Sequence, residues 1–379
     1  MVIYRNGMSR QTHSETDSDT ISVEPHSAGT VDRRAFLAST AALGAVGLAG
    51  CADDEGGAEY NAAIISSPAG FDDNAFNDNA RDGLRDAAEE FDLDINDVEE
   101  TEEAEYGSVQ SELAEEGIYD VIVMVGQQHF DPLVENSEEY PDQNWMLIND
   151  HVEGADNVSG WIEMNHEMSF LAGVAAGTLT THDIEHGDSS TNPDESVVGF
   201  VGGEDIDLIN AFETSYIEGI EWVNDDAEVL TGYGGSFSDT SAANDVASSQ
   251  IDDGADIVWH AASAAGAGAF SAAQDNDRFG LGVDVDQSIT EDQYSDVILG
   301  SSIKALNEAT FDVISAIVND DWDSVSGERN LSIEQGGIDF VTGQEFDGEL
   351  PAELDENLED AKDAFIAGEI ELTCGPTGC

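Results

Sequence analysis

Short apolar runs alternate with longer amphipathic runs along most of this chain, and no other feature of the sequence constrains the fold as strongly. Several apolar runs are nearly continuous in Val, Ile and Leu, which fits central strands of a parallel sheet covered on both faces. Strands are predicted over residues 61–67, 119–126, 145–150, 159–164, 197–203, 229–235, 257–262, 279–286 and 297–303. Helices are predicted over residues 75–91, 108–116, 168–180, 208–224, 242–253, 265–275, 306–318 and 354–366.

Repetition of a strand followed by a helix indicates parallel βαβ units, and these units are too numerous for one ordinary sheet. We therefore predict an α/β fold of two doubly wound parallel-sheet lobes with a ligand cleft between them. In such sheets ligands bind beyond the carboxyl ends of the strands. Residues that directly follow a strand are therefore the first candidates for a binding site.

Acidic residues dominate the charge of the chain: 83 Asp and Glu stand against 10 Lys and Arg, a formal net charge of −73. In ordinary salt this charge opposes a compact state through self-repulsion, whereas at molar salt the screening length falls to about 3 Å. We therefore expect a surface adapted to brine and a source among the halophilic archaea. A calcium-loaded acidic surface is the alternative, which the dispersed positions of the acids disfavour. The same charge argues strongly against nucleic acid as a partner.

The start of the chain reads as an export signal. Arg33 and Arg34 form a positive region, residues 35–50 form a small and apolar run, and Gly50 precedes Cys51 at a small-residue cleavage point. The run is shorter than the roughly twenty apolar residues that a membrane span needs. We expect cleavage before Cys51 and a lipid on its thiol, which would anchor the protein to the outer face of the cell membrane. The twin arginines predict translocation of an already folded protein.

The alternation of strands and helices, together with the export signal, gives the expected domain organisation. Residues 1–50 are the twin-arginine lipoprotein signal and leader, 51–59 a linker, 60–165 with about 290–320 the N-terminal lobe, 166–289 with about 321–370 the C-terminal lobe, and 371–379 a tail.

The residues after the first predicted strand carry a recognisable motif. Residues 70–77 (Gly-Phe-Asp-Asp-Asn-Ala-Phe-Asn) resemble the Gly-x-Asp-Asp-x-Ser-Phe-Asn signature of the basic membrane protein family, whose members are type I substrate-binding lipoproteins similar to a purine nucleoside receptor. Further segments match in family order: 119–122 (Tyr-Asp-Val-Ile), 148–150 (Ile-Asn-Asp), 167–173 (Glu-Met-Ser-Phe-Leu-Ala-Gly), 198–203 (Val-Gly-Phe-Val-Gly-Gly), 254–259 (Gly-Ala-Asp-Ile-Val-Trp), 282–287 (Gly-Val-Asp-Val-Asp-Gln) and 301–304 (Ser-Ser-Ile-Lys).

This resemblance implies the type I periplasmic-binding-protein fold and a role without catalysis. The implied protein is a monomeric solute-binding lipoprotein of an ABC importer, which closes two lobes on a nucleoside and delivers it to a membrane permease. No cofactor and no metal are expected. A binding protein for another polar solute such as a sugar, a surface hydrolase or metalloprotein, and a receptor that feeds a signalling partner remain alternatives.

A nucleoside needs aromatic faces for its base and strong hydrogen-bond acceptors for its vicinal hydroxyls, a role that carboxylates fill. The resemblance, with which this chemistry agrees, implies the ligand-binding residues Asp72, Phe76, Asn77, Asp150, Trp259, Asp284, Asp286 and Lys304. Phe76 and Trp259 are the expected stacking pair, although Phe76 taken alone fits a buried helix residue equally well. Asp284 or Asp286 is expected to take the ribose.

Lys304 stands out because basic residues are so scarce. The basic residues beyond the leader are Arg81, Arg85, Arg278, Lys304, Arg329 and Lys362. Lys304 directly follows an apolar strand, where a cleft residue lies. We expect it to donate hydrogen bonds to the ligand and to pair with Asp284 or Asp286; a structural salt bridge at the hinge between the lobes is the alternative.

Several positions depart from the family pattern. Ala75 stands where the signature has Ser, Ser238 stands where Asn is usual after a Phe, and Ala262 precedes Ser263 where a glycine is common. These differences bear on base preference more than on the fold.

Three other patterns in the chain are typical of metal sites or of cysteine chemistry. Residues 182–186 (His-Asp-Ile-Glu-His) match a zinc-peptidase pattern, but that pattern requires a helix and here lies in a polar, turn-rich stretch. Residues 92–103 mimic a calcium loop, yet Asp97 occupies the position that requires glycine. Cys374 and Cys379 flank turn residues at the C-terminus, where a disulfide, free thiols or a metal site are the options.

Overall fold

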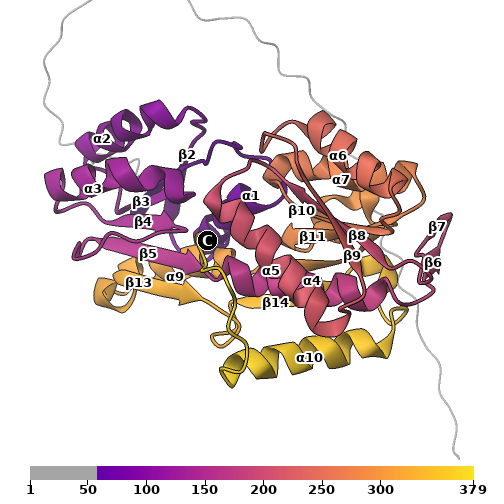
Figure 1. The fold of residues 1–379 in the computed structure, drawn as a ribbon. Helices are drawn as coiled ribbons and strands as arrows, with labels where there is room; N and C mark the ends of the chain where they lie inside the picture. Colours follow the sequence, from indigo (N-terminus) through magenta and orange to yellow (C-terminus); the bar gives the residue numbers. More distant parts are fainter. Residues whose placement is uncertain (1–57) are drawn as a thin grey trace, which may run out of the picture. The chain divides into compact units, whose positions relative to one another are not determined.

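The computed structural model describes residues 58–379, all of which lie in the unit from Glu55 to Cys379. The expected signal segment and Cys51 lie outside the described residues. Two six-stranded sheets form this unit, each with helices on its faces (Figure 1). The predicted α/β architecture of two sheets dominated by parallel pairing is confirmed.

The first sheet is parallel throughout and has the strand order β13-β5-β4-β3-β1-β2. Its strands are β1 (Tyr60–Ile65), β2 (Leu93–Val98), β3 (Val121–Met124), β4 (Trp145–Ile148), β5 (Val158–Glu163) and β13 (Gly327–Leu331). The helices that cover it are α1 (Phe76–Glu90), α2 (Tyr106–Glu116), α3 (Phe130–Glu139) and α9 (Leu306–Val318). Along β1, Ala62 and Ile64 join the core beneath α1 and α9, whereas Ala63 and Ile65 join the core beneath α2 and α3. Burial on both faces explains the continuous apolar run.

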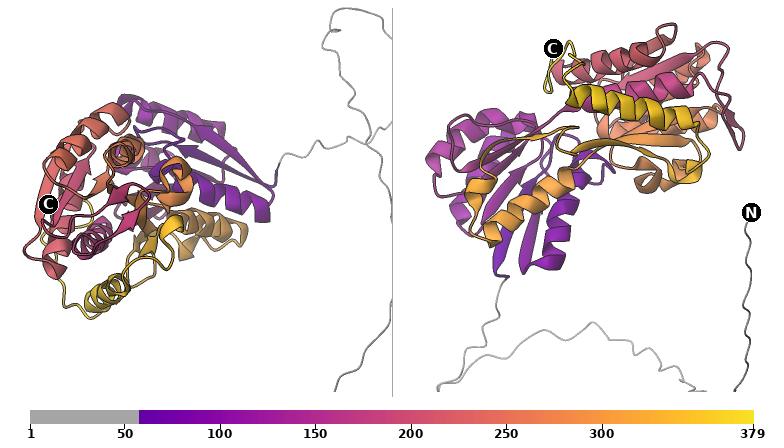
Figure 2. Two further views of the ribbon diagram at one scale, coloured as in Figure 1. Left: turned by 90° about the vertical axis from the view of Figure 1, so that its right-hand side faces the viewer. Right: turned by 90° about the horizontal axis from the view of Figure 1, so that it is seen from below.

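The second sheet has the order β14-β12-β11-β10-β8-β9, in which only β14 is antiparallel to its neighbour. Its strands are β8 (Val197–Gly202), β9 (Glu228–Tyr233), β10 (Ile257–Ala261), β11 (Phe279–Asp284), β12 (Ile298–Lys304) and β14 (Ile338–Thr342). Its helices are α4 (Asn165–Leu179), α5 (Asp207–Val223), α6 (Thr240–Asp252), α7 (Ala267–Asp275), the short α8 (Gln287–Thr290) and α10 (Ala352–Ile366). Figure 2 shows α10 lying against α4.

Glycines let α4 and α5 approach closely. A Cβ atom on Gly173 would lie 2.1 Å from the carbonyl oxygen of Tyr216, and one on Gly219 would lie 2.1 Å from that of Phe170. Both distances are far inside van der Waals contact, so only glycine fits at this helix crossing. The small residues of the 167–173 motif therefore serve the packing of the second lobe.

The described chain crosses between the sheets three times, at residues 163–165, 304–306 and 331–338; we call these three segments the hinge. They lie side by side, because the Met164 N–H donates to the Leu331 carbonyl and the Ala305 N–H donates to the Gly337 carbonyl, both at 2.9 Å. The hinge lies next to the ends of both sheets. Residues in it can therefore act on both lobes.

The lobe boundaries differ from those expected from the sequence. Residues about 290–320 were assigned to the first lobe, but β12 pairs with β11 and β14 in the second sheet. Residues about 321–370 were assigned to the second lobe, but β13 pairs with β5 in the first. Figure 1 shows β13 beside β5 and β14 near α4. An apolar run gives the same pattern in either sheet, so the sequence alone does not indicate which sheet a strand joins.

Two segments that mimic metal motifs adopt other structures. The acidic stretch that mimics a calcium loop contains edge strand β2, in which only Leu93 is buried. The stretch with His182 and His186 runs through a turn into a short hairpin, β6 (Glu185–His186) and β7 (Ser189–Ser190), so the helix that the zinc-peptidase pattern requires is not formed there. Among residues 58–379, no group of three or more His, Cys, Asp and Glu side chains is placed to hold a metal ion.

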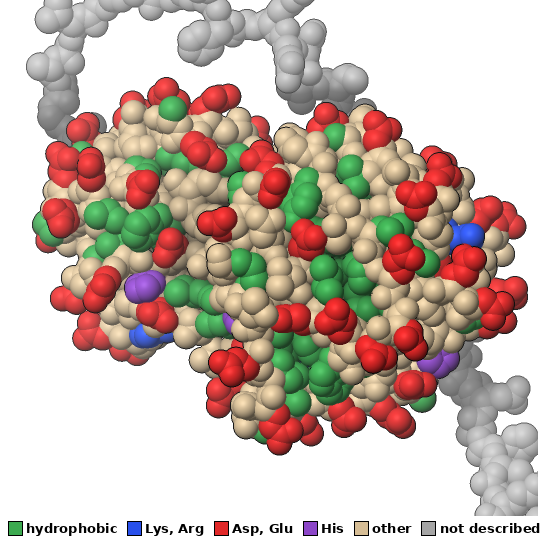
Figure 3. Space-filling view, viewed as in Figure 1, with side chains coloured by type: hydrophobic (Ala, Val, Ile, Leu, Met, Phe, Trp, Pro, Cys, Tyr) green, Lys and Arg blue, Asp and Glu red, His purple; other side chains and the backbone are tan. Residues whose placement is uncertain are grey.

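Acidic side chains are spread over the whole face shown in Figure 3, with few Lys and Arg among them. They are dispersed over both lobes and do not gather in a few loops. Within the described part of the chain, no helix is both long enough and apolar enough to cross a bilayer.

Candidate functional site

A cleft lies between the carboxyl ends of the two sheets. About 620 Å³ of empty space lies in it, a figure that includes space open to solvent. Its walls come from Ser67, Pro68, Ala69, Phe76, Gly126, Gln127, Gln128, Asn149, Leu208, Ile209, Phe212, Phe237, Ala261, Ala262, Ser263, Val283, Asp284 and Lys304. Most of these residues lie at the end of a strand or in the loop that follows one, which is where doubly wound sheets bind ligands.

Three phenylalanines from both lobes present their rings to the cleft. Phe76 begins α1 in the first lobe, Phe212 lies on α5, and Phe237 follows β9 in the second lobe. The ammonium of Lys304 lies 4.8 Å from the centre of the Phe76 ring. The cleft is therefore lined by aromatic side chains from both lobes, which can pack against a planar ring system.

Trp259 does not reach the cleft, and its expected role in stacking is wrong. Its side chain is fully buried in the core of the second lobe, where its indole N–H donates to the Gly282 carbonyl at 3.1 Å. It stacks against Phe212 and Tyr216 beneath α5. Only the end of β10, at Ala261, reaches the cleft, and Trp259 lies two residues earlier.

Lys304 ends β12 and forms the floor of the cleft. Its ammonium lies 3.0 Å from an oxygen of Asp284 and 3.2 Å from an oxygen of Glu163, and it donates to the side-chain oxygen of Asn165 at 3.2 Å. Burial alone would lower the pKa of Lys304, but the two carboxylates outweigh it and raise the pKa. Lys304 thus lines the cleft and also forms an ion pair at the hinge, so it combines the two roles that the sequence offered as alternatives.

Glu163 was not expected in the site. It ends β5 with no exposed surface, and burial raises the pKa of its carboxyl to about 7; Lys304 opposes this shift and the charge of Asp284 adds to it. Like Lys304, Glu163 ends a strand, and this position is the one sequence signal that could have indicated a place in the site. The chain has so many acidic residues that this signal did not distinguish Glu163 from the others.

Asn77 and Asp286 support the walls without lining the cleft. The Asn77 side chain accepts from the Ser67 N–H at 2.8 Å and donates to Asp73 at 2.9 Å, so it fixes the loop between β1 and α1. Asp286 accepts from the Ser288 N–H at 3.1 Å and caps α8. Neither residue is among those that line the cleft, and both side chains have structural roles there, which differs from the ligand contacts expected from the sequence.

Asp72 and Asp150 also lie outside the lining residues. The Asp72 side chain is 89% exposed and pairs with Arg81 at 2.8 Å, and this hydrogen bond lowers the pKa of its carboxyl. Asp150 accepts from the N–H of His151 at 2.8 Å, and partial burial raises its pKa. The preceding residue, Asn149, lines the cleft instead, because it is the first residue after β4.

Hydrogen bonds link the two lobes along one side of the cleft. The Ser263 hydroxyl donates to Asp73 at 2.8 Å, and the Asn74 amide donates to Glu291 at 3.1 Å. The Asn79 amide donates to the backbone carbonyl of Asp284 at 3.2 Å. The loop after β1 and the start of α1 therefore hold the second lobe in place, a role that the 70–77 motif alone did not indicate.

An acidic hollow adjoins the cleft. It shares Gln127 and Phe237 with the cleft and is lined by Glu103, Glu204, Asp205 and Asp207. Among the described residues, the cleft lining contains no Lys or Arg besides Lys304. An anionic ligand would therefore lie near these carboxylates and find one ammonium that is already paired.

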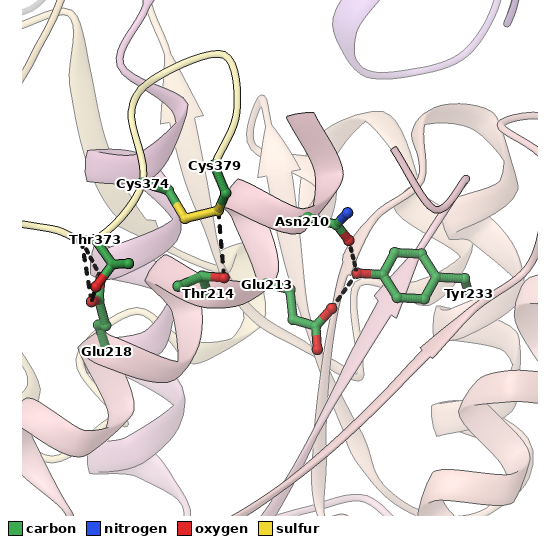
Figure 4. The surroundings of a disulfide bond; sticks show 8 residues. All are labelled: Asn210, Glu213, Thr214, Glu218, Tyr233, Thr373, Cys374 and Cys379. Carbon is green, nitrogen blue, oxygen red and sulfur yellow. Dashed lines mark hydrogen bonds between the residues drawn. A yellow bond between two sulfur atoms is a disulfide. The ribbon is translucent and has the colours of Figure 1, made fainter. Parts of the chain in front are cut away.

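The C-terminal tail packs beside the hinge. Cys374 and Cys379 form a disulfide, and Figure 4 shows this loop over α5, where Cys379 contacts Thr214. The Pro376 carbonyl of the loop accepts from the side-chain amide of Asn165 at 3.2 Å. Asn165 also contacts Lys304, so the tail supports the hinge at a residue adjacent to the cleft floor.

Comparisons with known proteins agree with this geometry. Residues 61–374 match the Bmp family, described as ABC transporter substrate-binding protein PnrA-like. A CD4+ T-cell-stimulating antigen of Listeria innocua is 27% identical over 360 residues, which cover 89% of this chain and 96% of that protein. The ABC transporter nucleoside-binding protein BmpA of Lactococcus lactis is 27% identical over 367 residues, which cover 90% of this chain and 99% of that protein.

Solved structures support the fold. A solute-binding protein of an ABC transporter system from Aeropyrum pernix K1 superposes with a TM-score of 0.72 at 22% identity, over 82% of this chain and 92% of that one. A periplasmic solute-binding protein from Actinobacillus succinogenes, with bound D-allose, superposes with a TM-score of 0.58 at 10% identity, over 76% of this chain and 100% of that one. The family match spans most of the chain and both lobes, so the protein belongs to the Bmp family of PnrA-like ABC transporter substrate-binding proteins.

Proposed function

We propose that the protein binds an uncharged nucleoside in the cleft and delivers it to the permease of an ABC importer. The observation that carries this proposal is the pairing of aromatic faces from both lobes, Phe76 and Phe237, with the Lys304 and Asp284 charges at the floor. A base would stack on the rings, and a ribose would donate its hydroxyls to Asp284. The relative in Lactococcus lactis is named a nucleoside-binding protein.

The charges of the cleft support an uncharged ligand. Lys304 has three N–H donors, and Glu163, Asp284 and Asn165 lie within reach of them. A phosphate group would therefore lack a free cation and would be repelled by the acidic hollow beside the cleft. Nucleosides are favoured over nucleotides on these grounds, and uncharged sugars over sugar acids.

Binding would work by closure of the two lobes. A ligand that touches Phe76 on one lobe and Asp284 on the other gains its full set of contacts only when the lobes meet, so it shifts the population toward the closed form. The hydrogen bonds of Asp73 and Asn74 across the cleft would then hold that form. The permease would recognise it, and no bond is made or broken.

The cellular setting is proposed on the same basis. A lipid on Cys51, after removal of the twin-arginine signal, would hold a monomeric receptor at the outer face of the membrane beside its permease. The acidic composition fits a halophilic archaeon as the source.

Calorimetric titration of the folded mature chain in molar KCl tests the proposal. Adenosine, inosine and uridine are titrated beside D-allose and adenosine monophosphate. We expect heat from at least one nucleoside and none from the nucleotide. Heat from D-allose without any from the nucleosides would move the protein to the sugar-binding class. Tight binding of the nucleotide would contradict the charge argument.

A further inference from the structure

Glu163 is a buried carboxylate in surplus at the cleft floor. It has no exposed surface, and its oxygens have no polar partner among residues 58–379 besides the ammonium of Lys304. Its charged partner, the Lys304 ammonium at 3.2 Å, also lies 3.0 Å from Asp284. One ammonium thus faces two carboxylates, so the cluster holds an uncompensated negative charge when both are ionised. Such a charge is costly in a buried site.

The position of Glu163 connects it to both lobes. It ends β5 in the first sheet, and Lys304 ends β12 in the second, so their pair joins the lobes at two hinge segments. Glu163 is not among the lining residues, whereas Lys304 and Asp284 are. Any effect of Glu163 on a ligand therefore passes through Lys304.

Few other charges act on Glu163. The titratable groups on the elements around it are Lys304 on β12, Asp284 on β11, His166 and Glu167 on α4, Asp150 and His151 after β4, and Glu328 and Arg329 on β13. Of these groups, Lys304 and Asp284 are the two whose charges shift the pKa of Glu163. Burial lowers the pKa of His166 to about 4, so that ring is neutral, and Glu167 accepts from the Ile333 N–H at 2.8 Å.

We propose that Glu163 is a positioning residue that takes up a proton when the lobes close on the ligand, so that ligand affinity falls as pH rises. This inference rests on the proposed function of the cleft. A ligand over Lys304 and Asp284 excludes water from the cluster, which makes the surplus negative charge more costly. A proton on Glu163 removes that charge. It also weakens the hold of Glu163 on the Lys304 ammonium, which frees a donor for the ligand.

The protonation of Glu163 can be tested in the ligand-free protein. Because burial raises the pKa of Glu163 from 4.5 to about 7, the stability it contributes is present below the lower value and lost as pH rises through the upper one. Thermal unfolding of wild type and Glu163→Gln is compared at about pH 5 and about pH 8 in molar KCl. We expect the wild-type midpoint to fall relative to that of Glu163→Gln between these values. A constant difference between the two proteins overturns the proposal.

The link to binding is tested with adenosine at about pH 6 and about pH 9, in two buffers of different ionisation enthalpy. Wild type should take up a fraction of a proton and lose affinity on the order of tenfold at the higher pH, which corresponds to one pKa unit. The Glu163→Gln variant should bind adenosine with the same affinity at both pH values. Wild-type affinity that does not change with pH, or an equal loss in Glu163→Gln, overturns the proposal.

Asp256→Asn is the matched control. Asp256 is a second buried carboxylate, and burial raises its pKa to about 6, but it accepts from Thr180 and Asn192 in the second lobe and does not line the cleft. This variant should keep the pH dependence of adenosine binding. Absence of heat at every pH would contradict the proposed function, and the unfolding comparison would still decide whether Glu163 holds a proton.

Discussion

Lys304 is a buried ammonium in a chain that has almost no cations. It is 4% exposed and contacts carboxylates from two different strands, Glu163 on β5 and Asp284 on β11. In molar salt a surface lysine contributes little, because exposed pairs are screened. A lysine that compensates two buried carboxylates cannot be replaced in the same way, since its loss leaves their charges without a partner.

Lys304→Met should therefore destabilise the fold by about 3–5 kcal/mol and abolish nucleoside binding. Urea unfolding in molar KCl measures the first effect and calorimetry the second. Lys362→Met is the control: its pair with Asp339 lies at the surface, and its loss should change stability by about 0–1 kcal/mol. Combining Lys304→Met with Glu163→Gln should recover part of the lost stability. Equal effects of the two lysine variants would contradict the role of burial.

Phe237→Ala should weaken nucleoside binding by about 1–3 kcal/mol, because an aromatic plate at the cleft wall would be lost. Trp259→Phe provides the contrast, since Trp259 lies in the core and its substitution should lower the unfolding midpoint with little change in affinity. Calorimetry and thermal unfolding of both variants separate the two effects. Affinity that depends on Trp259 and not on Phe237 would restore the stacking pair that the sequence suggested.

At the scale of the elements, the central strands and edge strand β9 could be predicted, whereas the edge strands β2, β13 and β14 could not. β3, β8 and β11 lie within predicted apolar runs and β1 begins one residue before its run, because burial on both faces demands apolar residues throughout. Edge strand β2 was missed because its sequence, Leu-Asp-Ile-Asn-Asp-Val, exposes most of its residues and forms a strand only through pairing with β1.

The residues of the candidate site likewise include some that the sequence indicated and others that it did not. Positions at strand ends indicated Asp284 and Lys304 as cleft residues, since the rule depends only on where strands end, whereas Phe76 was indicated by the family resemblance of residues 70–77. The expected stacking role of Trp259 is wrong because only the end of β10 reaches the cleft, and Trp259 lies two residues before that end, inside the core of the second lobe. Glu163 was missed because its importance comes from the partner that folding brings to it, and no local pattern records that partner.

The contact between α4 and α5 depends on two glycines, and Gly219→Ala tests it. The added methyl would lie 2.1 Å from the Phe170 carbonyl oxygen, so the helices would have to move apart. Overpacking of this kind costs about 1–3 kcal/mol. Gly234→Ala is the control, because its nearest neighbours lie at 3.4 Å or beyond. Urea unfolding should separate the two variants; equal midpoints would show that the helices adjust without cost.

At the scale of the whole molecule, net charge sets the conditions in which the fold is stable. The chain carries a formal charge of −73, and acidic side chains are spread over the face of the molecule that Figure 3 shows. Their mutual repulsion acts over about 10 Å at 0.1 M salt but only about 3 Å at 1 M. The folded state brings these charges closer together than the unfolded chain does, so screening favours folding.

We therefore expect the unfolding midpoint to rise steeply between about 0.1 M and about 1 M salt, more than for a protein of balanced charge. Thermal unfolding is followed by circular dichroism in KCl and, in parallel, in tetramethylammonium chloride, whose large cation screens charge but coordinates carboxylates poorly. Equal stabilisation by both salts supports screening. Stabilisation by KCl alone would instead indicate that bound potassium ions hold the acidic surface together, and a midpoint that does not depend on salt would contradict the expectation of a brine-adapted fold.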